Sequence, residues 1–298
     1  MSIQRELWTG ELIKQFRHEN EFLSRIASRN EFVNNNAIHL ADIGADPEVL
    51  VNNTTYPIPV SAREDEDIVL ALDKFETENT SISDDELYGL PYDKQGSVIN
   101  QHRETLEEKT AEKALHSLAP AADSATTPVV SSTGDSNGET QARKRLVIAD
   151  IVKLKKKMDD LKIPKKGREL VLCNAHVQDL LLVDEKFAKQ YQDIPEGKVL
   201  KLYGFNISES TYNPVYYDNG GTLTKRAWGA AAVPADDLDA SVAYYNGRAV
   251  QARGDVTMYL SEAKDNPEYR RSVVGFRLWH ICIPKKTLGF CALVSAKA

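Results

Sequence analysis

Apolar residues recur at helical spacing in two long stretches of this chain. Between Val147 and Leu161 they lie three or four positions apart, and Pro164 follows, which predicts an amphipathic helix that ends before the proline. From about 92 to 118 the apolar positions are sparse and charged residues are frequent. A long helix with so narrow an apolar side is typical of one that rests on a sheet. The sequence from Ser83 to Glu86 fits a capping box just before this region.

The first 40 residues predict an arm. Apolar side chains alternate with charged ones at roughly helical spacing, and four asparagines between Asn30 and Asn36 end the pattern. Because such a helix cannot bury its apolar side alone, it must pack on the rest of the subunit or on a neighbour. The apolar positions are Trp8, Leu12, Phe16, Phe22, Leu23 and Ile26.

Residues 47–80 predict two strands joined by an acidic tip. The first, at 49–60, alternates only in part and contains Pro57 and Pro59, whereas the second, from 68, alternates regularly. The tip at 63–67 consists of one arginine and four acidic residues. Since an isolated two-stranded ribbon is marginal in water, we expect this one to need a partner surface.

The segment 119–142 is rich in Ala, Ser, Thr, Gly and Pro and has no periodicity, which predicts a flexible or extended connection between two halves. The second half mixes helices and strands, as in an α+β protein. A helix opens at Asn174, a short one lies at 240–251, and 208–240 is loop-like with a turn at 218–221. The predicted strands are 169–173, 198–207, 256–261, 273–283 and 288–294.

Composition excludes several classes of protein. No run of about 18 apolar residues is present, so no transmembrane helix is expected, and the N-terminus lacks a secretory signal pattern. A net charge of −7 argues against a protein whose main task is to coat nucleic acid. Three cysteines without CxxC spacing predict buried, reduced thiols.

Motifs that carry chemistry are missing from the sequence. There is no phosphate-binding glycine loop, no HExxH zinc motif and no GxSxG nucleophile elbow, and the six histidines lie far apart. His102 is best interpreted as a solvated or packing residue and His280 as a core or interface histidine, and neither as a ligand. We therefore predict no catalytic, cofactor-binding or metal-binding residues, and a protein that is not an enzyme.

A basic run extends from Arg143 to Arg168 and contains seven lysines after Val152. We favour a solvated helix face, with nucleic-acid contact as the alternative. In a third interpretation, basic patches of one subunit meet the acidic tip of another and set their register.

The order of these parts resembles the HK97-like major capsid protein family of tailed bacteriophages, from about residue 40 onward. The match begins at Phe75–Ser83, where a strand leads through a capped turn into the long helix that ends at Leu118. The other similarities are Arg168–Cys173 before a helix, Gly204-Phe205-x-Ile207-x-x-Ser210, and closing strands through Gly275 and Gly289.

The resemblance implies an α+β, HK97-like capsid fold with four parts. These are an N-terminal arm (1–40), an extended β-hairpin E-loop (41–80), a peripheral domain (81–145) and an axial domain of mixed sheet and helices (146–251). The peripheral domain contains the spine helix (92–118) and the low-complexity insertion (119–142). Strands at about 252–285 complete it, and 286–298 complete the axial domain.

The implied function is self-assembly into hexamers and pentamers that form an icosahedral shell around a double-stranded DNA phage genome. The implied partners are copies of the chain, a separate scaffolding protein, a portal, decoration proteins, and the packaged DNA through weak non-specific contact, with no membrane. Assembly is expected in the bacterial cytoplasm and the product in the virion capsid. Assembly is expected to depend on a separate scaffold or on the arm itself, because no long helical scaffolding extension precedes the arm. No cross-link is predicted through Lys74, because no matching Asn and Glu motif is present.

Two alternatives remain open. The first is an encapsulin-like nanocompartment, which has the same fold but encloses an enzyme. The second is a hydrolase whose catalytic residues are dispersed along the sequence.

Overall fold

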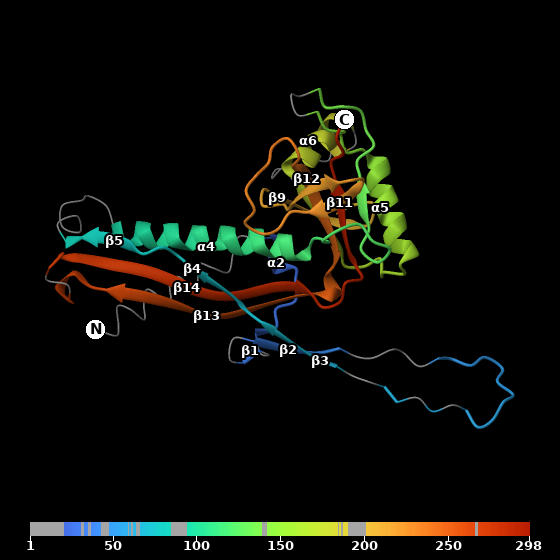
Figure 1. Cartoon of the computed structure of the whole chain (residues 1–298), viewed down its shortest axis with the longest axis horizontal. Helices are drawn as coiled ribbons and strands as arrows, with labels where there is room; N and C mark the ends of the chain where they lie inside the picture. Colours follow the sequence, from blue (N-terminus) through green and yellow to red (C-terminus); the bar gives the residue numbers. More distant parts are fainter. Residues whose placement is uncertain are drawn as a thin grey trace.

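The computed structural model of the chain describes residues 21–30, 33–34, 37–42, 48–58, 60, 62–63, 66–84, 94–138, 142–183, 185, 187–189, 201–265 and 268–298. A long helix lies along long strands, a second sheet sits at one end of them, and a thin ribbon projects away (Figure 1). We call these parts the elongated layer, the eight-stranded sheet and the ribbon.

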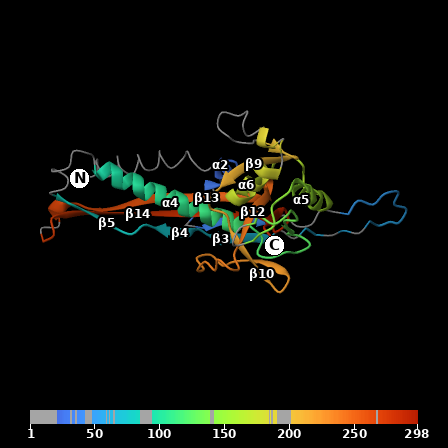
Figure 2. The same cartoon turned by 90° about the horizontal axis from the view of Figure 1, so that it is seen from above.

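The elongated layer is a four-stranded antiparallel sheet with one helix lying on it. Its elements are β4 (Asp73–Glu76), β5 (Thr80–Ser83), α4 (Lys94–Leu118), β13 (Ala249–Ser261) and β14 (Arg271–Pro284). Strand β14 lies in the middle, with β13 on one side and β4 followed by β5 on the other. The helix lies along the sheet in both views (Figures 1 and 2), and Val98, Ile99 and Leu106 pack against β13 and β14. The predicted long helix is confirmed over 94–118, and it rests on a sheet as its narrow apolar side indicates.

The junction of β4 and β5 contains a bulge opposite a glycine of β14. Residues 77–79 face only two residues of β14, because Glu76 pairs with Arg277 and Thr80 with Val274. The Phe276 amide donates to Thr77 Oγ1 at 3.0 Å, and the Thr77 amide donates to the Phe276 carbonyl at 3.0 Å. A Cβ at position 275 would collide with Asn79 Oδ1, so a larger residue there would force the Asn79 side chain to move. Both sides of this bulge belong to the segments that carry the resemblance.

The second part is a mixed sheet of eight strands with helices on one face. Its strands are β6 (Val129–Ser131), β7 (Arg168–Cys173), β8 (Lys201–Leu202), β9 (Phe205–Ser210), β10 (Val215–Asn219), β11 (Thr222–Lys225), β12 (Leu238–Tyr245) and β15 (Phe290–Val294). The main order is β11-β10-β12-β7-β9-β8, and β15 pairs with both β12 and β6. Helices α5 (Ile148–Asp160) and α6 (Asn174–Val183) pack on one face. The predicted helix ending before Pro164 is α5, and the helix opened by Asn174 is α6.

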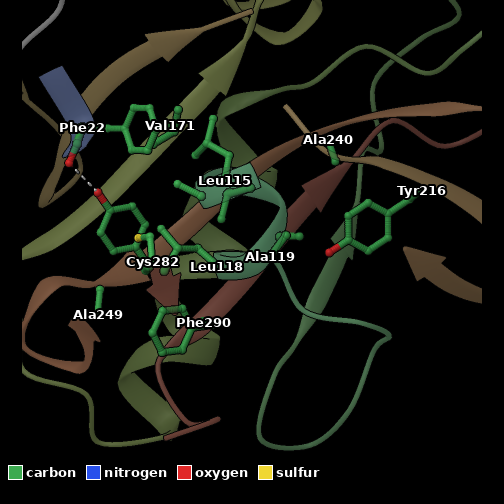
Figure 3. Close-up of a cluster of buried hydrophobic side chains, with 14 of the residues drawn as sticks. Phe22, Leu115, Leu118, Ala119, Val171, Tyr216, Ala240, Ala249, Cys282 and Phe290 are labelled. Atoms are coloured by element: carbon green, nitrogen blue, oxygen red, sulfur yellow. Dashed lines mark hydrogen bonds between the residues drawn. The ribbon is translucent and has the colours of Figure 1, made fainter. Parts of the chain in front are cut away.

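The C-terminal end of α4 packs on the other face of the eight-stranded sheet and joins it to the elongated layer. Leu115 and Leu118 are buried with Val171, Val242 and Phe290 in one apolar cluster (Figure 3). Two tyrosines close the cluster with hydrogen bonds to the backbone. The Tyr216 hydroxyl donates to the Pro120 carbonyl at 2.5 Å, and the Tyr244 hydroxyl donates to the Phe22 carbonyl at 3.3 Å.

The described part of segment 119–142 contains the short strand β6. Val129 and Val130 are buried, and β6 pairs in parallel with β15. Asp123 Oδ1 accepts a hydrogen bond from the Val129 amide at 2.7 Å, which holds the entry to the strand. Of the two predicted alternatives, the structure favours an extended connection over a flexible one, because β6 is stabilised by a partner that lies far away in the sequence.

Two other elements differ from the prediction. Residues 240–251 are not a helix: β12 ends at Tyr245, a 3₁₀ turn follows at Asn246–Arg248, and β13 begins. Pairing on both sides of β12 overrides the helical preference of its alanines.

The single strand expected at 198–207 is the hairpin of β8 and β9, because Gly204 at φ 90° makes a turn. The loop-like segment 208–240 contains β10 and β11 around the predicted turn, where Asp218 Oδ1 accepts from the Gly221 amide at 2.7 Å.

The ribbon pairs β2 (Ala37–Asp42) with β3 (Glu66–Ala71), and β1 (Val33–Asn34) adds to β2. The outgoing strand expected at 49–60 was wrong, since Pro57 and Pro59 lack the amide hydrogens that a ladder needs. The strand lies at 37–42, before the expected start of the E-loop at 41. Because Glu66 and Asp67 are paired within β3, these two residues of the acidic stretch do not lie at the tip.

Of the predicted arm, the structure describes only the part from residue 21. A short helix α2 (Glu21–Ser24) leads to residues 27–29, which hydrogen-bond to Gln251 of β13. Phe22 and Ile26 are buried, as expected of an arm that packs on its own subunit. Trp8, Leu12 and Phe16, and the capping box apart from Ser83 and Asp84, lie outside the described residues. The remaining short element is a 3₁₀ turn at Ala263–Asp265.

We expect Leu115→Ala to lower the free energy of unfolding by about 2–5 kcal/mol, because it opens a cavity where α4 meets the eight-stranded sheet. Leu115 is fully buried, whereas Gln101 on the same helix is exposed. Urea denaturation of the unassembled subunit measures the difference, with Gln101→Ala as the control. Equal effects of the two substitutions would show that the cluster does not hold the two parts together.

Candidate assembly surfaces

The ribbon carries the most exposed apolar side chains of the described chain. Val49, Val51 and Val60 are 82%, 80% and 99% exposed, and Tyr56 and Ile58 are also exposed. In Figure 1 this part extends beyond the rest of the molecule and touches nothing at its end. Apolar side chains gathered on a projecting element mark a surface that another molecule covers.

The base of the ribbon is fixed to the elongated layer. Ile38 of β2 is fully buried, in a small cluster with Leu72, Ala252 and Ile281. Hydrogen bonds pair β2 with β3 from Ala37 and Ala71 out to Asp42 and Glu66. Packing and strand pairing at its base therefore fix the direction in which the ribbon projects.

The outward side of α4 is a polar surface. Its exposed residues include Asn100, Gln101, Glu104 and Glu108, and a shallow hollow at the N-terminal part of the helix is lined by Gly96 and Ser97 with three of the same polar residues. Lys109 Nζ and Glu112 Oε2 lie 2.8 Å apart on this side. Such a surface is suited to hydrated or hydrogen-bonded contact instead of tight apolar packing.

A lysine from the eight-stranded sheet binds the C-terminal end of α4. Lys225 Nζ donates to the carbonyls of His116 at 2.6 Å and Ala119 at 2.7 Å, which are orphan acceptors at a helix end. Burial, with a smaller effect of Lys113, lowers the pKa of Lys225 to about 8. His116 Nε2 is 2.8 Å from the Arg226 carbonyl, and its ring meets Trp228 edge-on at 5.5 Å. Strand β11 thus fixes the angle at which the long helix meets the second sheet.

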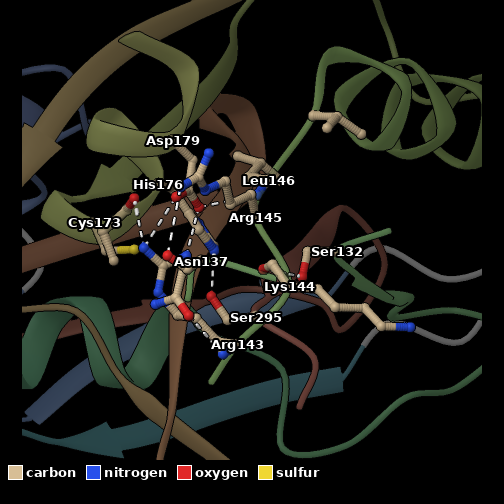
Figure 4. Close-up of polar contacts among 12 residues, drawn as sticks. Ser132, Asn137, Arg143, Lys144, Arg145, Leu146, Cys173, His176, Asp179 and Ser295 are labelled. Carbon is tan, nitrogen blue, oxygen red and sulfur yellow. Dashed lines mark hydrogen bonds and ion pairs between the residues drawn. The ribbon is translucent and has the colours of Figure 1, made fainter. Parts of the chain in front are cut away.

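A buried polar network ties α6 to the end of the chain (Figure 4). The Asp179 carboxylate accepts hydrogen bonds from Arg143 at 2.5 Å and from the Leu146 amide at 2.9 Å. The two ring nitrogens of His176 lie 2.6 Å from Ser241 Oγ and 3.0 Å from Ser295 Oγ. All three of these residues are fully buried, so the serine–histidine contacts hold structure together and are closed to a substrate.

Sequence reasoning missed this network, and only one local signal pointed to it. The Cys173 amide donates to Ser241 Oγ at 3.0 Å, and Cys173 lies three positions before His176. Ser241 lies in β12 and Ser295 directly after β15, both far away in the sequence. Burial lowers the pKa of His176 to about 4, against 6.5 in the free side chain, although nearby Asp179 opposes the shift. A neutral imidazole can donate through one nitrogen and accept through the other, which matches its two serine partners.

The basic run between 143 and 168 divides into two groups. The buried Arg168 forms an ion pair with Asp159 at 2.6 Å, and the half-buried Arg143 forms one with Asp179 at 2.5 Å. The solvated-face interpretation therefore fails for these two arginines and holds for the lysines, of which Lys153 and Lys156 on α5 are exposed. The proposed contact between basic patches and an acidic tip is weakened, because Glu66 and Asp67 are in β3 and not at a tip. Glu64 and Asp65 lie outside the described residues.

Within the described ranges, no group of three or more His, Cys, Asp or Glu side chains is arranged to hold a metal ion. No helix among those described is both long and apolar enough to cross a membrane. Cys173, Cys282 and Cys291 are buried and free, as predicted. His102 and His280 are also buried: the His102 ring packs on Phe276 at 5.3 Å, and burial holds the pKa of His280 at about 4.

Comparison with known proteins gives similarity in structure but not in sequence. No protein-family model matches the chain, and no curated protein matches its sequence. The capsid of Ralstonia phage GP4 is similar with a TM-score of 0.65 at 8% identity, over 95% of this chain and 92% of that one. The capsid of Cyanophage P-SCSP1u gives a TM-score of 0.59 at 16% identity, over 92% and 90%.

The chain has the HK97-like fold of phage capsid proteins. The predicted fold class is thereby confirmed. The same capsid fold occurs in the virus-like particle from Pyrococcus furiosus, with a TM-score of 0.56 at 10% identity over 97% of this chain and 99% of that one. The similarity spans both sheets and most of the chain. The surfaces described above therefore belong to elements of this fold.

The buried histidines His176 and His280 predict that the folded chain loses stability in acid. In the unfolded chain the two imidazoles take up a proton near pH 6.5. In the folded chain burial lowers their pKa values, so they take up a proton only near pH 4. Because the unfolded state binds more protons between these values, the free energy of unfolding falls as the pH drops from 6.5 to 4, by on the order of 3 kcal/mol for each histidine.

His280→Phe should remove one part of this pH dependence, since phenylalanine does not titrate. Urea denaturation at a series of pH values tests this on the unassembled subunit. We expect the free energies of unfolding of parent and variant to differ by a constant amount above pH 7.5. Below pH 6.5 the difference should change with pH, because only the parent has a histidine at position 280 that must stay neutral in the folded state. A constant separation at all pH values would contradict the assignment.

Proposed function

We propose that the chain is a major capsid protein that assembles into hexamers and pentamers of a closed icosahedral shell. One observation carries the proposal: a chain with the fold of phage capsid proteins projects an apolar ribbon that its own described residues leave uncovered. A second copy is the partner that every subunit of a shell has available. Repetition of such contacts around a closed lattice makes interfaces that are weak alone stable together.

In this proposal each part of the fold has a place in the shell. The ribbon is the E-loop and lies over the elongated layer of the neighbouring subunit, which corresponds to the peripheral domain with α4 as the spine helix. The eight-stranded sheet is the axial domain and points to the centre of the capsomer. Segment 119–142 then belongs with the axial domain, because β6 is part of that sheet.

The shell would enclose double-stranded DNA and be assembled in a bacterial cytoplasm with a separate scaffolding protein, a portal and decoration proteins. The capsids of two phages among the similar structures support a virion as the final location. An encapsulin-like nanocompartment is the second candidate, because the virus-like particle from Pyrococcus furiosus has the same fold. A gene for a terminase or portal beside this one favours the virus, and a gene for an enzyme cargo favours the compartment.

Electron microscopy of the purified chain, alone and co-expressed with phage proteins, tests the shell. We expect hexamers, pentamers, sheets or closed particles in at least one of the two preparations. A stable monomer in both would overturn the proposal.

The ribbon can be tested separately from folding. Val51→Ser with Val60→Ser should reduce the yield of particles at least about tenfold, since two buried valines contribute roughly 2 kcal/mol or more to each contact and a closed lattice repeats that contact. The melting temperature of the unassembled subunit should hardly change, because both side chains are exposed.

The matched control is Val152→Ser with Val183→Ser, which alters two exposed valines on α5 and α6. This control should assemble like the parent chain. If both pairs reduce assembly equally, loss of exposed apolar surface in general, and not the ribbon, would explain the result.

A further inference from the structure

The positive charge of the chain is concentrated on one short segment. Residues 153–166, which cover most of α5 and the turn after it, contain seven lysines and two aspartates, a net charge of +5. The whole chain has a net charge of −7, so the other 284 residues carry −12. An anion approaching this subunit is therefore attracted to the α5 segment and repelled by most of the remaining surface.

The lysines of this segment are available for a partner. Among the residues that the structure describes, none of their side chains forms a hydrogen bond or ion pair. Of the two aspartates, Asp159 is already paired with the buried Arg168 at 2.6 Å. The fully buried Ile151, Leu154 and Met158 turn the apolar side of α5 toward the sheet. The exposed lysines are Lys153, Lys156, Lys162, Lys165 and Lys166.

The chemistry of this surface suits phosphates better than a protein partner. The cores of protein interfaces are depleted in lysine and rely on apolar or aromatic anchors. Here Val152 is the one large apolar side chain of α5 that is clearly exposed, at 44%. Lysine ammonium groups on flexible stems act as hydrated point charges, which match a phosphate backbone without fixed geometry.

We propose that the lysine face of α5 is the surface through which the subunit contacts the phosphodiester backbone of double-stranded DNA. The inference rests on the proposed function, which supplies a shell around DNA, and it identifies the contacting surface. Helix α5 is about 20 Å long, and each strand of DNA carries about six phosphates over that length. The contact is independent of base sequence, because it involves phosphates alone. It also requires that α5 face the inside of the shell.

The test measures binding of a fluorescent 20-base-pair duplex of mixed sequence to the dilute, unassembled full chain, at salt concentrations from about 50 to 200 mM. The variant carries Lys153→Gln, Lys156→Gln, Lys165→Gln and Lys166→Gln. We expect binding at low salt to weaken at least about tenfold and the slope of log K against log salt to become shallower by about 3–4, roughly 1 for each lysine removed. The melting temperature should stay within a few degrees of the parent, since all four side chains are exposed.

The control removes the same charge from other exposed positions, by Lys189→Gln, Lys201→Gln, Lys264→Gln and Lys286→Gln. It should retain the parent affinity and slope. Equal weakening by the two variants would overturn the proposal, since net charge alone would then explain binding. Tighter binding of poly-glutamate than of the duplex, at equal charge, would also overturn it and indicate an acidic protein as the partner.

Assembly of the same variants separates this inference from the proposed function. If the α5 variant binds DNA like the parent but forms no particles, the lysines face a neighbouring subunit and the inference fails. If the parent forms no particles while the α5 variant still loses DNA binding, the shell proposal fails and the binding surface stands.

Discussion

The subunit depends on one junction, where the C-terminal end of α4 meets the eight-stranded sheet. Without it the long helix would rest only on the narrow sheet of the elongated layer, since its apolar side is sparse elsewhere. Leu115 and Leu118 supply the apolar part of the contact, and Lys225 satisfies carbonyls at the helix end. Apolar burial provides most of the stabilisation there, while the directional hydrogen bonds fix the angle. The relative orientation of the two sheets, and so the direction of every outer surface, follows from this contact.

The outer surfaces that the junction of α4 and the eight-stranded sheet orients have different chemistry. The ribbon is anchored at its base by Ile38 and exposes apolar side chains at its far end, whereas α4 and α5 present polar and basic faces. In the proposed shell this difference in chemistry limits wrong pairings, because an apolar ribbon gains little from a charged face.

The sequence was sufficient to predict elements whose apolar residues recur at regular spacing. Helices α4 and α5, strands β7, β14 and β15, and the second half of β13 were predicted, and the bulge residues Thr77 and Gly275 lie in the segments that carried the family resemblance. The errors have different physical causes. Pro57 and Pro59 prevent the expected outgoing strand of the ribbon, and Gly204 divides one expected strand into a hairpin. Two further errors come from pairing over long sequence distances. Strands β6 and β12 depend on pairing with β15, which lies far away in the sequence, and local composition contains no trace of such a partner. The network around His176 was missed for the same reason, and only the spacing to Cys173 was local.

The position of β14 and β15 in the chain has a consequence for the timing of synthesis. Both are inner strands of their sheets, and each follows all of its partner strands in the chain. A chain synthesised only as far as residue 270 can form α4 and α5 but lacks the strand that joins β13 to β4 and the one that joins β12 to β6. Neither sheet is complete until residues 271–294 have been added. A chain that lacks them cannot hold its outer surfaces in their final arrangement.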